Sequence, residues 1–257
     1  MLILLPPSEG KTRPESGAAF DLAALSFPAL TPTRELLVRS LIRLSSGNPK
    51  RAAELLGLGP TQAGAIAVNA ALRDEPTARA DEIYTGVLFS ALDLSTLDDA
   101  CRRRADDSLA IASALFGLLR PGDPIPAYRL SGTVTLPRLG TVAGRWRVLL
   151  PRAMHEATGD GLLIDLRSGT YTALGKPPAQ LADRTATMRV LHEHNGHRKV
   201  VSHFNKATKG RIVRGLLESG ADPRSIDELE STLKDLGWTI ERVGNRLDVI
   251  VDEVPAT

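Results

Sequence analysis

The sequence predicts an α/β (α+β) fold, a single compact domain with a mixed sheet and flanking helices. Short apolar runs of strand length alternate with segments whose apolar residues recur at helical spacing. A hairpin signal, Asn195-Gly196, adds an antiparallel pair of strands to the sheet. The chain has 257 residues, 42% of them hydrophobic, and no internal repeat or long linker divides it. We therefore expect one domain over residues 1–257.

The first third of the chain predicts one strand and three helices. Leu2–Leu5 is apolar on both faces, which is typical of a central strand, and "PPSEGKT" is the loop that leaves it. The spacing of apolar residues predicts a helix over Thr33–Arg43. Two shorter helices are predicted over residues 49–56 and 61–72, on either side of a turn rich in glycine.

The remainder of the chain continues the alternation of strands and helices. We expect a strand end at Ile83 and Tyr84, then a helix that carries Arg102, Arg103 and Arg104 on its solvated face, and a buried strand around "LAIASALFGLL" that ends in the turn "RPGDPIP". A strand-like piece leading to a helix is expected over "GTVTLPRLGTVAGRWRVLLPRAMHEA", followed by an apolar run in "GLLIDLRSGTYTAL" and the hairpin around Asn195-Gly196. The last expected elements are a cationic helix ended by Ser219-Gly220 and a hairpin in "GWTIERVGNRLDVIVD".

Composition excludes several classes of protein. With 32 Lys and Arg against 30 Asp and Glu, the net charge of +2 does not describe a polycation, so nucleic-acid binding would depend on a local basic patch. The single Cys101 excludes an intramolecular disulfide and a Cys-rich zinc site. No apolar segment approaches the ~20 residues needed to span a bilayer, and the N-terminus reads as a buried strand. We expect a cytoplasmic protein with no membrane contact.

The segment "LLGLGPTQAG", residues 55–64, is similar to the helix-hairpin-helix element of proteins that bind DNA without sequence specificity. Gly57 and Gly59 would let the backbone turn with its amides uncovered, and Pro60 suits the first turn of the next helix. Free amides at a helix N-terminus attract a phosphate. The alternative is a plain bend between two helices, because Thr61 and Gln62 stand where such elements usually carry cations. Both interpretations stay open.

Polar residues outside this element fall into loop segments that could converge on one site. They are Ser8 and Lys11, Tyr84 and Gly86, Arg120, Asp123, Tyr128 and Arg129, then Asp165, Ser168, Tyr171 and Lys176, and finally Ser202, Asn205, Lys206, Lys209 and Arg214. These ordered blocks, above all "LFGLLRPGDPIPAYRLSG", resemble the YaaA family, also called DUF328 or UPF0246, of peroxide stress proteins. The resemblance runs from Met1 to about Leu217.

This resemblance implies a compact α/β fold with a positively charged cleft and a helix-hairpin-helix-like element over about residues 49–72. It also implies binding of double-stranded DNA without sequence specificity, in a peroxide stress response linked to limiting free intracellular iron. On this hypothesis the DNA phosphates would be contacted by Ser8, Lys11, Arg120, Arg129, Ser168, Lys176, Lys206, Lys209 and Arg214, together with the amides of Gly57 and Gly59.

An enzyme cleft is the alternative hypothesis for the same residues. Lys11 or Lys176 would then be a reactive amine, and Tyr84, Tyr128 or Asp165 a proton-transfer group, acting on a small anionic or nucleobase-like ligand. The sequence has no Walker loop and no GxSxG elbow that would fix a reaction. Any one arginine could instead be structural, with Arg120 or Arg129 pairing with Asp123 or Asp165.

A metal site is the third hypothesis and depends on the hairpin histidines. His192 and His194 project from one strand face, and the turn would place His197 opposite His194, so that three imidazoles could meet. Hairpin tips are exposed and surface histidines are common, so this hypothesis is the weakest of the three. The sequence predicts no cofactor and leaves the oligomeric state open.

Overall fold

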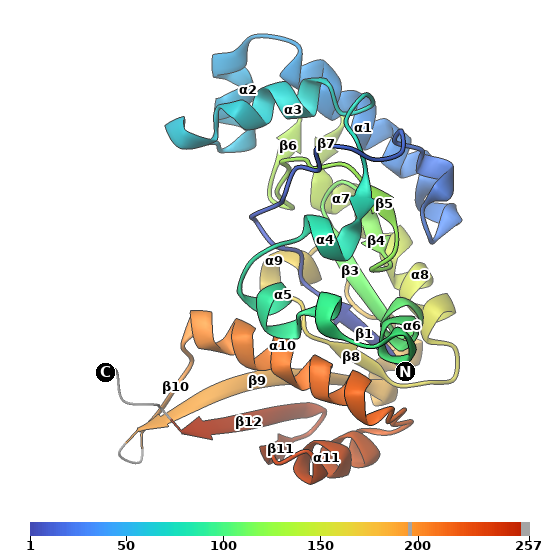
Figure 1. Ribbon diagram of the computed structural model, residues 1–257, viewed down its shortest axis with the longest axis vertical. Coiled ribbons are helices and arrows are strands. Elements are labelled where there is room, and N and C mark those ends of the chain that lie inside the picture. Colours follow the sequence, from blue (N-terminus) through green and yellow to red (C-terminus); the bar gives the residue numbers. More distant parts are fainter. Residues whose placement is uncertain (195–196, 253–257) are drawn as a thin grey trace.

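An eight-stranded mixed sheet forms the centre of the computed structural model, which describes residues 1–194 and 197–252 (Figure 1). Its strands are β1 (Leu2–Leu5), β3 (Leu109–Ser113), β4 (Gly117–Leu119), β8 (Leu163–Asp165), β9 (Thr185–His194), β10 (His197–Lys199), β11 (Thr239–Val243) and β12 (Arg246–Asp252). Their order is β11-β12-β9-β8-β1-β3-β4, and β10 pairs with β9. The run β3-β1-β8-β9-β12 is parallel, whereas β4, β10 and β11 are antiparallel to their neighbours. The predicted α/β fold with a mixed sheet is confirmed.

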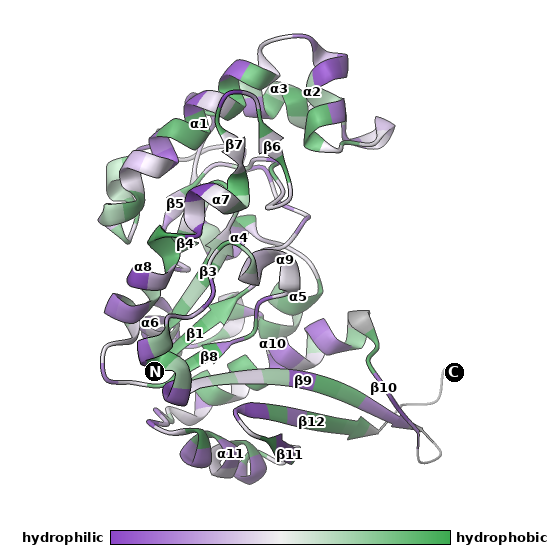
Figure 2. Ribbon diagram, turned by 180° about the vertical axis from the view of Figure 1, so that it is seen from behind, coloured by the Kyte–Doolittle hydropathy of each residue, from purple (hydrophilic) through white to green (hydrophobic). Residues whose placement is uncertain are grey.

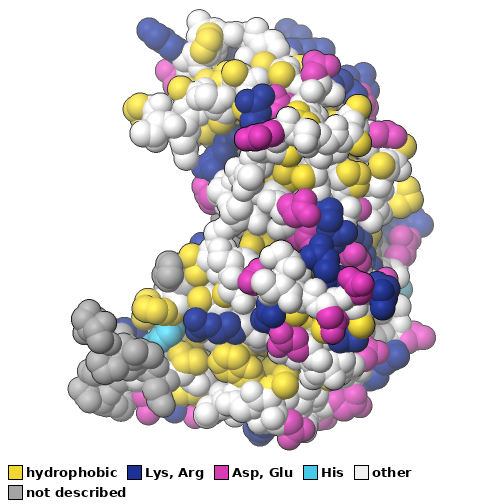
Figure 3. Space-filling view, in the orientation of Figure 1, with side chains coloured by type: hydrophobic (Ala, Val, Ile, Leu, Met, Phe, Trp, Pro, Cys, Tyr) yellow, Lys and Arg dark blue, Asp and Glu magenta, His cyan; other side chains and the backbone are white. Residues whose placement is uncertain are grey.

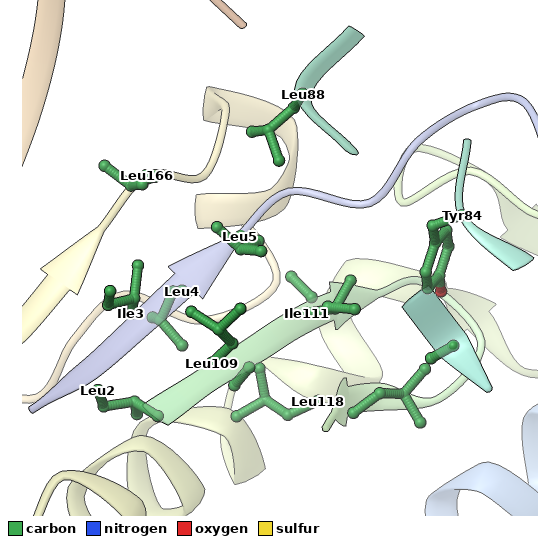
Figure 4. Packing of buried hydrophobic residues seen from close by; sticks show 14 of the residues in the cluster. Leu2, Ile3, Leu4, Leu5, Tyr84, Leu88, Leu109, Ile111, Leu118 and Leu166 are labelled. Atoms are coloured by element: carbon green, nitrogen blue, oxygen red, sulfur yellow. The ribbon is translucent and has the colours of Figure 1, made fainter. Parts of the chain in front are cut away.

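The central position of β1 follows from its composition. All four residues of Leu2–Leu5 are fully buried, as the apolar run predicts for a strand covered on both faces. On its two sides β1 pairs in parallel with β3 and β8, both of which are buried throughout. Figure 4 shows Leu4, Leu109 and Ile111 packed together on these neighbouring strands. Burial of such side chains contributes about 1.5 to 3 kcal/mol each.

Helices surround the sheet and extend beyond it. They are α1 (Thr31–Ser45), α2 (Pro49–Leu56), α3 (Gly64–Ala70), α4 (Ala80–Ile83), α5 (Val87–Leu92), α6 (Asp99–Ser108), α7 (Val142–Trp146), α8 (Leu149–Thr158), α9 (Gly169–Thr172), α10 (Ser202–Ser219) and α11 (Ile226–Asp235). The short 3-10 helices are η1 (Leu22–Ala24), η2 (Pro28–Leu30), η3 (Pro60–Gln62), η4 (Leu94–Thr96) and η5 (Ala179–Arg184). Two small sheets have two strands each: β2 (Ala78–Arg79) pairs with β5 (Pro124–Ile125), and β6 (Thr135–Leu136) pairs with β7 (Gly140–Thr141). In Figure 2 the apolar residues concentrate on the central strands and on the helix faces turned toward them.

Several sequence expectations needed correction or refinement. The strand end expected at Ile83 and Tyr84 is instead the end of the helix α4, and Tyr84 pairs with Lys11 in an isolated bridge. The buried run around residues 109–119 is two antiparallel strands, because Gly117 has a φ of 78° and the chain turns there. The helix expected over residues 61–72 is divided into η3 and α3. The Asn195-Gly196 turn lies outside the described residues, although β9 and β10 on either side of it pair antiparallel as expected. Within the described residues, no helix combines the length and the apolar character needed to cross a membrane.

Gly210 sets the distance between α10 and α5. A Cβ atom at this position would collide with the backbone carbonyl of Leu88 and would lie 3.0 Å from the Cβ of Ala91. Only glycine therefore allows the two helices to pack at this separation. Because α10 also packs against β9, this contact joins α5 to the sheet.

Helices α1, α2 and α3 form an arm that one buried arginine fastens to the sheet. Arg34 of α1 is fully buried, and its guanidinium donates to the carbonyls of Phe116 at 2.9 Å, Leu118 at 2.8 Å and Ser26 at 2.7 Å. Figure 1 shows the arm at one end and the β9–β10 pair at the other, with α5 and α9 facing the concave side between them. Figure 3 shows this hollow on the molecular surface.

Candidate functional site

A cleft of about 500 Å³ opens at the carboxyl ends of β1 and β8. It is walled by the loop after β1 (residues 6–10), the N-terminal part of α5 with the preceding residues (85–89), the segment after β8 (166–171) and the first turns of α10. The chain runs from β1 to a neighbour on one side, β3, and later to one on the other side, β8. Such a switch point in a parallel sheet leaves a crevice beyond the strand ends, where ligands commonly bind.

A second hollow of about 190 Å³ continues this cleft toward the arm. The two share Ser8, Glu9, Ser131, Thr133 and Tyr171. The second hollow adds Lys11 and the turn at Gly57. The cleft and the second hollow together are called the groove below. The groove therefore runs from the end of the sheet to the turn between α2 and α3.

Lys11 lies in the wall of the groove with its amine enclosed by two aromatic rings. Its Nζ lies 4.5 Å from the ring centroid of Tyr128 and 5.2 Å from that of Tyr84, and it donates to the carbonyl of Ser8 at 3.0 Å. A backbone bridge between Lys11 and Tyr84 fixes the loop in this place. Burial and the nearby charge of Arg129, opposed by Glu9, lower the pKa of Lys11 to about 7.

The two tyrosines behind Lys11 form a buried chain of hydroxyl groups. The Tyr84 and Tyr128 hydroxyls are 2.8 Å apart, and Tyr128 reaches Ser113 Oγ at 2.7 Å. Ser113 Oγ also accepts the amide N–H of Phe116 at 2.9 Å, which orients the far end of the chain. Burial raises the pKa of both tyrosines well above the usual range, so their hydroxyls stay protonated at neutral pH.

Arg129 is held in place by two residues that the sequence analysis missed. Its guanidinium donates to the carboxylate of Glu9 at 2.7 Å and to the Glu9 carbonyl at 2.8 Å. Asn69 of α3 is fully buried, and its side-chain amide both accepts from the backbone N–H and donates to the carbonyl of Arg129, each at 2.8 Å. A lone Asn within the apolar stretch "AIAVNAAL" was the signal available in the sequence for this clasp.

The first turns of α10 supply the other cations of the groove. Lys206 is exposed at the rim, while Lys209 is half-buried and donates to the carbonyl of Leu166 at 3.4 Å. Burial lowers the pKa of Lys209, and the charge of Asp165 opposes this shift. Asn205, one turn before Lys209, has a buried Oδ1 with no hydrogen-bond partner among the described residues. Ser168 of the segment after β8 also lines the cleft.

Three predicted site residues lie outside the groove. Arg120 follows the antiparallel strand β4, so it sits at the opposite edge of the sheet and donates to the carbonyl of Leu109 at 2.8 Å. Arg214 donates to the carbonyls of Leu92 and Asp93, which fastens α10 to the end of α5. Lys176 is exposed and outside the lining of the groove.

Asp165 stands at the end of β8 but is not a free acid. Its carboxylate forms a bidentate ion pair with Arg167, whose Nε and Nη2 lie 2.9 Å and 2.8 Å from the two oxygens. The exposed fractions of the two side chains are 5% and 0%, so solvent does not compete for this pair. The Arg129–Asp165 and Arg120–Asp165 pairs considered from the sequence do not form. Asp123 instead accepts from the backbone amide of Arg120 at 2.9 Å.

The amides of the glycine turn are not uncovered as expected. Gly57 has a φ of 65° and ends α2, and its N–H bonds to the carbonyl of Glu54 at 3.2 Å. The N–H of Gly59 bonds to Oε1 of Gln62 at 3.3 Å. Gly57 borders the groove, while Gly59 lies outside its lining. A phosphate at this turn would have to displace these partners.

The histidines do not form a metal site in the described part of the chain. The ladder places His197 opposite His194, as predicted. His192 is buried, with its ring 5.3 Å from that of Phe204, whereas His197 is exposed. The side chain of His194 lies outside what the structure describes. Among the described residues no three His, Cys, Asp or Glu side chains are grouped to hold a metal ion.

Comparisons with known proteins agree with the resemblance seen in the sequence. The family model described as peroxide stress protein YaaA matches residues 1–242. A UPF0246 protein of Streptomyces coelicolor is 49% identical over 99% of this chain and 100% of its own length. A second, from Corynebacterium efficiens, is 44% identical over 94% of this chain and 95% of its own. This chain therefore belongs to the YaaA (UPF0246) family of peroxide stress proteins.

Proposed function

We propose that this protein acts in peroxide stress by binding duplex DNA without sequence specificity, through phosphate contacts along the groove. Membership of the family supports the role in peroxide stress. The observation that carries the DNA hypothesis is that the groove is continuous from the α10 lysines to the Gly57 turn. We further propose, from the resemblance alone, that this binding serves a response that limits free intracellular iron.

Four basic side chains line this groove in the described part of the chain, namely Lys11, Arg129, Lys206 and Lys209, and the lowered pKa of Lys11 leaves it only partly charged at pH 7. This set is smaller than the sequence suggested, because Arg120, Lys176 and Arg214 lie elsewhere. Arg129 must also exchange part of its contact with Glu9 for a phosphate. Duplex binding should therefore be weak and only moderately dependent on salt.

The salt dependence of duplex binding is the first test. For about three to four neutralised phosphates, a log-log plot of affinity against salt should have a slope of about −3, which lowers affinity about 60-fold between 50 and 200 mM salt. Fluorescence anisotropy with two labelled duplexes of unrelated sequence should give equal affinities. Replacing Lys206 and Lys209 together by Ala should reduce the slope by about 2.

The control for this test is Lys176→Ala, which removes one exposed lysine outside the groove. It should leave the slope and the affinity unchanged. An absence of binding at low salt would contradict the DNA hypothesis. Equal losses in the control and in the Lys206 and Lys209 variant would show that binding does not use the groove.

A second candidate function, an enzyme or receptor for a small anionic or nucleobase-like ligand, is favoured by Asn205. A buried acceptor without a donor is costly, and an amino or N–H group of a ligand in the cleft would satisfy it. The cleft volume of about 500 Å³ also lies within the range of small-molecule sites. Nucleobases and nucleoside monophosphates should then raise the Tm of the wild type and not that of Asn205→Leu. No shift with any of them would reject this candidate.

A further inference from the structure

Lys11 is a half-buried residue whose amine lies between two aromatic rings, a setting that a structural lysine does not need. Its Nζ is enclosed by the faces of Tyr84 and Tyr128 and donates to one carbonyl, that of Ser8. Among the described residues no carboxylate forms an ion pair with it, because the nearby carboxylate of Glu9 pairs with Arg129, and the repulsion from Arg129 outweighs the attraction of Glu9. A methionine would fill this apolar cage without the cost of a buried charge. The amine is therefore better explained by reactivity than by packing.

A neutral amine is a nucleophile toward carbonyl carbon, and the surroundings of Lys11 favour that form. The burial that lowers its pKa to about 7 leaves about half of the amine groups unprotonated at pH 7. An ordinary lysine has almost no neutral amine at that pH. Lysines activated in this way by desolvation and by a neighbouring cation form imines with aldehydes and ketones.

The hollow that Lys11 lines is the smaller of the two parts of the groove, and it suits a small reacting group. Its volume of about 190 Å³ is room for about six water molecules. Small-molecule sites usually measure about 300 to 1,000 Å³, so this hollow is small for a whole nucleotide. A deoxyribose that has lost its base is smaller and, in its open-chain form, carries an aldehyde at C1′. Arg129 lies beside Lys11 in the same wall, where its guanidinium can donate hydrogen bonds to a flanking phosphate.

We infer that Lys11 forms a covalent imine with the C1′ aldehyde of an abasic deoxyribose in DNA held in the groove. This inference rests on the proposed DNA binding. The lone pair of Nζ forms the N–C1′ bond while the C–O π electrons move to oxygen, which is protonated. Loss of this oxygen as water, with uptake of one proton in total, leaves the protonated imine. No oxidant, reductant or metal is consumed.

Reductive trapping tests the inference. A labelled duplex with one abasic site is incubated with the wild type and borohydride, which converts an imine into a stable amine, and the covalent product is measured on a denaturing gel. The wild type should give a cross-link that peptide mapping places on residue 11. The yield of cross-linked product should be at least about tenfold lower for Lys11→Met than for the wild type. Lys176→Met, which removes an exposed lysine outside the groove, should give the same yield as the wild type.

Two further arms separate the possible outcomes. A duplex with a tetrahydrofuran analogue, which lacks the aldehyde, measures binding alone. If the wild type does not bind it at low salt, the proposed function fails and the inference fails with it. If it binds but no cross-link forms, or if Lys11→Met cross-links like the wild type, the inference alone is overturned. Free deoxyribose 5-phosphate tests the other source of aldehyde, and trapping of Lys11 by it as fast as by the abasic duplex would reject DNA as the substrate.

Discussion

Lys11→Met is expected to raise the free energy of unfolding at pH 7 by about 2 to 4 kcal/mol. The shift of the Lys11 pKa from 10.5 to about 7 corresponds to a cost of about 5 kcal/mol for the charged form in the folded state. Loss of the bond to the Ser8 carbonyl and of the contacts with both ring faces offsets part of the gain. The variant should therefore be more stable and less functional, as expected where a site carries a costly group.

The effect should depend on pH in a defined direction. Between about pH 7 and 10.5 the unfolded chain binds more protons at Lys11 than the folded chain does, so this group makes wild-type stability rise with pH. Below pH 7 both states are protonated and the cost is complete. The advantage of Lys11→Met, measured by urea unfolding, should be largest at about pH 6 and shrink toward pH 10. If Lys11→Met lowered the free energy of unfolding by the same amount at every pH, the charged amine of Lys11 would not carry the desolvation cost assigned to it.

Arg34→Ala is expected to destabilise the folded chain by at least about 4 kcal/mol. Its three bonds to the carbonyls of Ser26, Phe116 and Leu118 are charge-assisted, and such bonds contribute about 1.5 to 3 kcal/mol each. Burial lowers the pKa of Arg34 to about 10, with Asp123 opposing the shift, so part of that contribution already compensates for desolvation. Removal of the side chain leaves these carbonyls without their donor and leaves a cavity under the arm.

Arg39→Ala provides the matched control on the same helix. Arg39 is 62% exposed and pairs with Glu35 at 3.0 Å, an arrangement worth about 0.5 kcal/mol or less. Urea unfolding should therefore separate the two variants clearly. Equal stability of Arg34→Ala and Arg39→Ala would mean that the arm is held to the sheet by apolar packing alone.

The fold was predictable wherever a strand or helix carries its own periodicity. Leu2–Leu5 is apolar on both faces because both faces are covered, and the helix expected over Thr33–Arg43 is the interior of α1. The division of β3 from β4 was not predictable, because residues 114–116 in the turn are as apolar and as buried as the strands beside them. Gly117 was the one conformational signal there.

The site was predictable for residues on loops that follow parallel strands. Ser8 and Ser168 line the same cleft because β1 and β8 end at the same edge of the sheet, and Ser8 also lines the second hollow together with Lys11. Arg120 seemed equivalent in sequence but follows an antiparallel strand, and residue type does not reveal strand direction. Asp165 pairs with Arg167, two residues further along the chain, because a buried carboxylate is stabilised by a guanidinium nearby. This pairing was not predicted from the sequence.

Gly210 controls the width of the cleft although it does not line it. The helices α5 and α10 form opposing walls, and the absent Cβ of Gly210 fixes how near they stand. Any larger residue at position 210 would push α10 away from α5, and Asn205, Lys206 and Lys209 would move with it. The chemistry of these three side chains would stay the same. The width of the cleft is thus set at a position outside its lining, and a substitution there would change the width without altering a residue of the lining.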